Sequence, residues 1–112
     1  MPSTTNYQAG ELVLIDFPFT TGAQSKVRPA LMLLDAGGAD ILVARITTQS
    51  VTTLYDVPLT DWQQAGLLAP SAVRLHKLVT SAKHRVNRLL GRLTSQDHQT
   101  ISAVLLQTFG SW

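Results

Sequence analysis

Short apolar runs that stop at proline or glycine restrict the fold of this chain more than any other feature. Residues 11–17 (ELVLIDF) form a compact run of Leu, Val, Ile and Phe that ends at Pro18. A run of this length and branching is typical of a largely buried strand, and proline cannot donate to a sheet ladder. Two more runs, residues 30–34 and 41–46, flank a glycine turn at residues 35–40 and predict a hairpin.

One amphipathic segment near the end of the chain predicts a helix. Ile101 and Val104 belong to an apolar stripe at helical spacing. Thr94 or Ser95 can cap this helix at its start, and Gly110 can end it. Between the hairpin and this helix, the sequence predicts a loop at 47–55, a strand at 56–59, a helical turn at 61–65 capped by Thr60, a bent strand at 71–80, a turn or one helical turn at 81–87 and a strand at 89–93.

Short strands with one closing helix indicate a small sheet-rich barrel or an α+β fold. The 112 residues include no cysteine and suffice for one domain with its own core. We expect residues 1–9 to be a flexible tail and residues 10–112 to be a single domain. The tail lacks the pattern of a signal peptide, and no apolar run reaches the roughly 18–20 residues of a membrane span. These features predict a soluble, cytoplasmic protein with no membrane segment.

Basic residues are unevenly distributed, although the net charge is only +2. Six of the nine Lys and Arg residues lie within residues 74–92, a stretch without Asp or Glu. Such a stretch produces a local positive field that suits a polyanion, although a solvated basic face gives the same pattern. The chain is also 45% hydrophobic and only 14% charged, which suggests that a partner covers part of its surface.

Several kinds of site are disfavoured by the sequence. His76, His84 and His98 are scattered without the spacing of metal ligands, so no metal is expected. The glycines at 37–38 lack the lysine and hydroxyl residue of a phosphate-binding loop. A two-histidine ribonuclease built on His76 and His84 is conceivable, but their spacing does not support it.

Basic and hydroxyl residues at strand ends remain as candidates. Arg28 precedes one strand of the expected hairpin and Thr47 follows the other, so strand pairing would bring the two side chains close together. When the 2′-hydroxyl of RNA attacks the adjacent phosphate, the reaction needs charge stabilisation and a proton for the leaving 5′-oxygen. Arginine offers a fork of donors to phosphate oxygens, and threonine offers one more. An ordinary solvated arginine before a strand gives the same pattern.

Several segments, in this order and spacing, resemble the PemK/MazF toxins. They are GELVLIDF at 10–17, KVRPAL at 26–31, ITTQ at 46–49, GL at 66–67, SAVRL at 71–75 and LGRL at 90–93. The resemblance covers about residues 9–109. It implies an SH3-like barrel with short helices and a C-terminal helix, a fold shared with the CcdB toxins. It also implies a homodimeric, metal-independent endoribonuclease of a type II toxin–antitoxin system that uses no cofactor.

The resemblance also implies roles for individual residues. Arg28 would stabilise the scissile phosphate and act as the general acid, and Thr47 would hydrogen-bond the same phosphate. Residues 22–26 resemble a mobile loop that covers the RNA. The implied partners are single-stranded RNA and a cognate antitoxin whose C-terminal tail occupies the same groove. Further RNA contacts are expected from Gln24, Ser25, Lys26, Thr48, Gln49 and Lys77.

The first loop and the segment at 77–80 depart from the family pattern, and two other function classes stay open. Many relatives have Gln-x-Arg-Thr where this chain has KLVT at 77–80, so a preferred RNA sequence does not carry over. A toxin that poisons a protein target such as gyrase, as CcdB does, would not require Arg28 and Thr47. A non-catalytic RNA-binding module would use the basic stretch at 74–92 and leave RNA intact.

Overall fold

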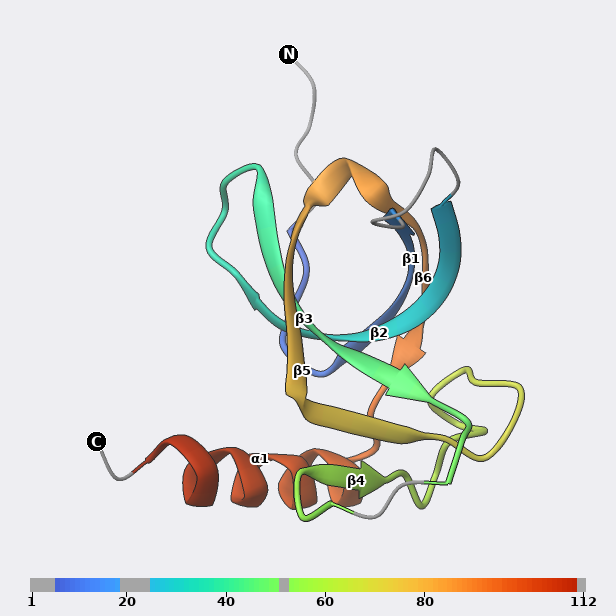
Figure 1. Ribbon diagram of the computed structural model, residues 1–112, viewed down its shortest axis with the longest axis vertical. Coiled ribbons are helices and arrows are strands. Elements are labelled where there is room, and N and C mark those ends of the chain that lie inside the picture. The colour runs from blue at the N-terminus through green and yellow to red at the C-terminus, as the bar shows by residue number, and fades with distance from the viewer. Residues whose placement is uncertain (1–5, 19–24, 51–52, 111–112) are drawn as a thin grey trace.

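The computed structural model describes residues 6–18, 25–50 and 53–110, which form a curled antiparallel sheet and one long helix. The strand order is β4-β5-β3-β2-β1-β6. Figure 1 shows the sheet bending round on itself, with the helix lying beside β4. The elements are β1 (Glu11–Pro18), β2 (Ser25–Asp35), β3 (Asp40–Thr47), β4 (Asp56–Pro58), β5 (Ala72–Ala82), the 3-10 turn η1 (Lys83–Arg85), β6 (Val86–Arg92) and α1 (Ser95–Phe109).

The fold class expected from the sequence is confirmed. The structure is α+β, mostly antiparallel sheet, with a short helical turn and a C-terminal helix. Within the described residues the edge strands β4 and β6 do not pair with each other, so the curled sheet is not hydrogen-bonded into a closed barrel. That part of the chain also contains no helix with the length and hydropathy needed to cross a membrane.

The hairpin of β2 and β3 is confirmed, but β2 begins earlier than the sequence predicts. Ser25 to Val27 belong to the strand and not to a loop, because they pair with the end of β1. Pro29 therefore lies inside β2, opposite Leu14. The pairing of β3 with β2 begins at Ala30, so Pro29 occupies a position where its missing N–H costs no bond to β3. Pairing with β1 here overrides local turn propensity.

Two predictions for the second half are wrong in detail. The turn or helical turn expected at 81–87 is a single 3-10 turn, Lys83–Arg85. It is shorter than expected because β5 continues to Ala82 and β6 already begins at Val86, where it pairs with Ile15 of β1. The segment expected to be a helical turn forms hydrogen-bonded turns without a helix. Its N–H groups at Thr60 and Asp61 are capped by the distant carboxylate of Asp97, at 3.0 and 2.8 Å.

The boundaries of the last helix agree with the sequence. The Thr94 hydroxyl accepts a hydrogen bond from the Asp97 N–H and so caps α1. The helix ends at Phe109, and the N–H of Gly110 still donates to the Leu106 carbonyl. Asp97 therefore serves two elements, since it lies in the first turn of α1 and also holds the segment at 60–61.

The bend expected in β5 is confirmed and sharply turns the sheet. The partner of β5 residue Leu78 is Ala44, whereas the partner of Arg74 is the next β3 residue, Arg45. Residues 75–77 therefore have no counterpart on β3, and the strand changes direction there, as Figure 1 shows. This bend leaves Arg45 and Arg74 directly opposite each other.

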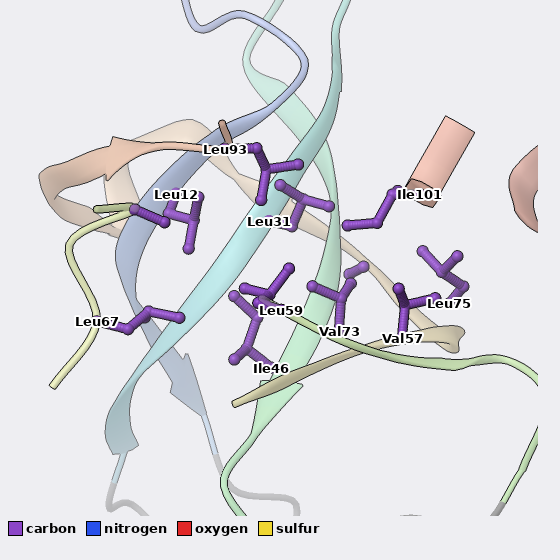
Figure 2. Close-up of a cluster of buried hydrophobic side chains, with 12 residues drawn as sticks. Leu12, Leu31, Ile46, Val57, Leu59, Leu67, Val73, Leu75, Leu93 and Ile101 are labelled. Carbon is purple, nitrogen blue, oxygen red and sulfur yellow. The ribbon is translucent and has the colours of Figure 1, made fainter. Parts of the chain in front are cut away.

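The two faces of the sheet each carry a buried core. Alternate residues of β1 serve different cores, which explains why its whole run is apolar: Leu12 belongs to one and Val13 to the other. Figure 2 shows the first core, in which strand residues such as Leu31 and Val73 meet Ile101 of α1. The second core lies on the opposite face and consists of Val13, Ile15, Phe17, Ala30, Met32, Ile41 and Val43.

A close approach of two backbone segments joins the turn before Leu67 to β6. Gly66 has a φ of +95°, a conformation that favours glycine. A Cβ atom at Gly66 would collide with the carbonyl oxygen of Leu90, and one at Gly91 would collide with the carbonyl oxygen of Ala65. The two glycines therefore allow a contact that no other residue pair would permit.

Candidate functional site

Arg28 and Thr47 line the same pocket. The last register pair between β2 and β3 is Ala30 with Arg45, and two further residues along the same register place Arg28 opposite Thr47. The pocket has a volume of about 180 Å³ and lies where β1, β2, β3 and β5 meet. This arginine pocket is lined by Phe17, Arg28, Pro29, Arg45, Ile46, Thr47 and Arg74.

The local contacts leave both candidate side chains able to bind a ligand. Arg28 is exposed, and its Nη1 donates to the carbonyl of Val27 at 3.2 Å. No carboxylate in the described part of the chain forms an ion pair with it. The Thr47 hydroxyl oxygen accepts the N–H of Gln49 at 3.1 Å, so its hydroxyl hydrogen can be donated elsewhere. Such a pair can present several donors to an anion.

Arg45 and Arg74 also line this pocket, although the sequence analysis did not assign them to the site. The guanidinium carbon of Arg45 lies 4.6 Å from the ring centroid of Phe17, which is a cation–π distance. The Nε of Arg74 donates to Asp56 Oδ1 at 2.9 Å. A charged residue inside the apolar run at 41–46 was the available signal for Arg45. Nothing local distinguished Arg74 from its basic neighbours.

Asp56 is a buried carboxylate that holds Arg74 in place. Its side chain is fully shielded from solvent, and it accepts hydrogen bonds from the Thr53 hydroxyl at 2.6 Å and from Arg74. Desolvation by burial raises the pKa of Asp56, but the hydrogen bonds from Thr53 and Arg74 and the nearby positive charge outweigh it and lower the pKa below its usual value. Asp56 is therefore ionised at neutral pH and compensates the charge of Arg74.

The other predicted RNA-binding residues are dispersed. Lys26 is exposed on β2 opposite Phe17, and Lys77 is exposed in the bend of β5. Thr48 lines a neighbouring hollow that shares Pro29 with the arginine pocket. Gln49 is exposed, Ser25 is the first residue of β2, and Gln24 lies outside the described residues, as does most of the loop at 22–26.

The basic stretch at 74–92 is not one positive patch, because acidic residues from elsewhere neutralise half of it. Arg74 pairs with Asp56 as described. Lys83 pairs with Asp35 at 3.0 Å, and Arg92 lies 3.6 Å from Glu11. The field that the sequence suggested is therefore weaker, and the arginine pocket is assembled from three separate segments instead.

Two of the larger hollows lined by described residues differ chemically from the arginine pocket. One, of about 420 Å³, lies between α1 and the sheet and is lined mainly by leucines. The other, of about 490 Å³, is the hollow beside Pro29 and Thr48, and Arg88 is its charged lining residue. Among the described residues, no three histidine or acidic side chains gather closely enough to hold a metal ion. The chemistry for an anion is thus concentrated in the smaller pocket.

Known proteins place this fold in a family. No curated protein sequence matches the chain. A mycobacterial endoribonuclease structure is 19% identical, with a TM-score of 0.73 over 96% of both chains. A mycobacterial endoribonuclease in complex with its cognate antitoxin is 21% identical, with a TM-score of 0.69 over 93% of this chain and 95% of that one. MazE–MazF from Deinococcus radiodurans is 18% identical, with a TM-score of 0.75 over 95% and 98%.

These structures show that the fold is shared, and the sequence match to a family goes further. The profile of the family described as PemK-like, MazF-like toxin of type II toxin–antitoxin system matches residues 8–109, which is nearly the whole chain. The chain therefore belongs to the PemK/MazF toxin family.

Proposed function

We propose that this protein is a metal-independent endoribonuclease that cuts single-stranded RNA at the arginine pocket. The observation that carries the proposal is the presence of Arg28 and Thr47 in one pocket, where no described carboxylate neutralises Arg28. Structural neighbours named as endoribonucleases share the fold. A guanidinium without a described carboxylate partner, in one pocket with a hydroxyl, is suited to a phosphodiester.

In the proposed reaction, the 2′-oxygen forms a bond to phosphorus while the bond from phosphorus to the 5′-oxygen breaks. The proton of the 2′-hydroxyl passes to water. Arg28 donates hydrogen bonds to the non-bridging oxygens, where charge develops, and supplies the proton to the leaving 5′-oxygen. The guanidine then regains a proton from the water that accepted the 2′-hydroxyl proton. Thr47 donates its hydroxyl hydrogen to the same phosphate. The products are a 2′,3′-cyclic phosphate and a 5′-hydroxyl.

The partners follow from the same family relationship. We propose a homodimer whose activity is blocked by a cognate antitoxin, because one structural neighbour is an endoribonuclease with its antitoxin and another is a MazE–MazF structure. The antitoxin would cover the groove that contains the arginine pocket and so exclude RNA.

The test is incubation of the purified protein with mixed-sequence single-stranded RNA in EDTA, beside the Arg28→Ala variant prepared identically. We expect discrete cuts with 2′,3′-cyclic phosphate ends from the wild type and intact RNA from the variant. An unchanged circular dichroism spectrum is the control that the variant is folded. Equal cutting by both proteins would show that a contaminant or another site is responsible. Intact RNA that is nevertheless bound would favour a binding module, and neither binding nor cutting would favour a toxin with a protein target.

A further inference from the structure

The opposed pair of Arg45 and Arg74 is the least expected feature of the pocket. The two residues are direct register partners on β3 and β5, and like charges placed opposite each other destabilise a sheet. Asp56 compensates Arg74, whereas no described carboxylate pairs with Arg45. The positive charge at this point of the sheet therefore exceeds what the fold itself neutralises.

Both guanidinium groups are held by contacts that leave donors available. The guanidinium carbon of Arg45 lies 4.6 Å from the centroid of the Phe17 ring. This cation–π contact leaves the N–H groups of Arg45 available as hydrogen-bond donors. Arg74 uses Nε for Asp56, and its Nη2 is 3.5 Å from the His76 ring nitrogen. The forked ends are thus oriented in advance, which reduces the entropy lost when an anion binds.

The arrangement of strands sets the size of the ligand. Arg28, Arg45 and Arg74 come from β2, β3 and β5, which are neighbours in the sheet, as Figure 1 shows. Adjacent strands lie about 4.8 Å apart, and Arg28 lies two residues from Ala30, the partner of Arg45. The backbone positions of the three arginines therefore spread over at least about 10 Å, more than one phosphate group occupies. A row of this length fits consecutive phosphates of one strand.

We infer that Arg45 and Arg74 form a second phosphate subsite, which holds the phosphodiester next to the one at Arg28 and Thr47 in single-stranded nucleic acid. Asp56 is a positioning residue for this subsite, because it acts through Arg74. The inference rests on the proposed function for the place of the scissile phosphate, but binding at the subsite does not require cleavage.

The test measures binding of a fluorescein-labelled 2′-O-methyl RNA of mixed sequence by anisotropy at several NaCl concentrations. This probe lacks the attacking hydroxyl, so it reports binding even if the protein cuts no RNA. Each lost phosphate contact on a single strand should reduce the slope of log K against log salt by about 0.7. We therefore expect Arg45→Gln and Arg74→Gln each to weaken binding and to lower the slope by that amount.

The matched control is Arg92→Gln, which removes the same charge on β6, where Arg92 lies near Glu11. We expect its slope to equal that of the wild type. If Arg74→Gln fails to fold because Asp56 is left unpaired, the Asp56→Asn/Arg74→Gln pair removes both charges, and Arg45→Gln disturbs no buried carboxylate. A purely structural role for the arginines would change the melting temperature and leave the slope unchanged.

Two outcomes would overturn the inference. Wild-type affinity and slope in the folded Arg45→Gln variant would show that no second phosphate is held there. Loss of affinity for an acidic peptide, with RNA binding unaffected, would show that the subsite serves a protein partner. If unmodified RNA is not cut but the slopes change as expected, the proposed function fails and the phosphate subsite stands.

Discussion

Two groups of basic residues in this protein differ in what surrounds them. On β6 and the turn before it, Lys83 and Arg92 have carboxylate partners in Asp35 and Glu11. At the arginine pocket, Arg28 and Arg45 have no such partner among the described residues, and Arg74 pairs with Asp56. Lys83 and Arg92 come from one basic stretch of the sequence, yet each has a carboxylate beside it in space. The second group is scattered in the sequence but concentrated in space.

The difference teaches that strand pairing, and not a run of like charges, brings the pocket arginines together here. A basic run on a β-strand points to both faces, and each residue meets whatever the neighbouring strands present. Arg45 and Arg74 meet each other only because β5 bends between residues 75 and 77. The following predictions test whether the two groups are as different in function as they are in surroundings.

The largest effect is expected from Arg28→Lys. This substitution retains the charge but loses the planar fork, so donors that stabilise the phosphate in the transition state are removed. We expect the single-turnover cleavage rate to fall on the order of 100-fold, as for the loss of one preorganised donor. A rate within a factor of two of the wild type would show that a point charge suffices at this position.

A smaller loss of activity is expected from Thr47→Ala. Only one neutral donor is removed, which corresponds to about 1 kcal/mol or a five- to tenfold slower cleavage. Thr47→Ser keeps the hydroxyl and is the matched control, with a rate near that of the wild type. Equal rates for the alanine and serine variants would remove Thr47 from the mechanism.

Loss of the carboxylate that pairs with Lys83 should change the pH dependence of stability and leave the cleavage activity unchanged. The N–H groups of Tyr7 and Gly37, together with Lys83, lower the pKa of Asp35 below its ordinary value of 3.8. A lowered folded pKa stabilises the protein above about pH 4, and this contribution is lost as the pH falls through the folded pKa. We expect Asp35→Asn to lower the urea midpoint at pH 7 and to flatten the acid side of the stability profile.

Cleavage by Asp35→Asn at pH 7 and 25 °C should equal that of the wild type, because the protein remains folded and the arginine pocket is unchanged. A loss of cleavage without a loss of stability would contradict the separation of the two basic groups. Asp56 has a lowered pKa as well, so part of the acid sensitivity should persist in this variant.

The smallest effect is expected from Arg92→Gln. Its side chain is 64% exposed and its nearest carboxylate oxygen is 3.6 Å away, so solvent screens the pair. The free energy of unfolding should change by less than about 0.5 kcal/mol in urea titrations. A larger loss would mean that the charge on β6 is structurally more important than its exposure indicates.

The sequence predicted features that depend on local chemistry. The apolar run of β1, the hairpin, the bend in β5 and the capped helix follow from side-chain periodicity and turn residues, and the family pattern pointed to Arg28 and Thr47. It missed the early start of β2, which depends on pairing with the end of β1, and the cap that Asp97 provides at residues 60–61, whose partners lie more than 30 residues away. Arg45 and Arg74 were missed for the same reason.

The contact between Gly66 and Gly91 has a consequence for the mutational tolerance of this chain. Each glycine faces the backbone of the other segment, so no side-chain rearrangement elsewhere can relieve an added Cβ atom. A larger residue at one of the two positions cannot be compensated by a smaller residue at the other, because glycine already has no side chain. In a library of random single substitutions selected for soluble protein, both positions should retain only glycine.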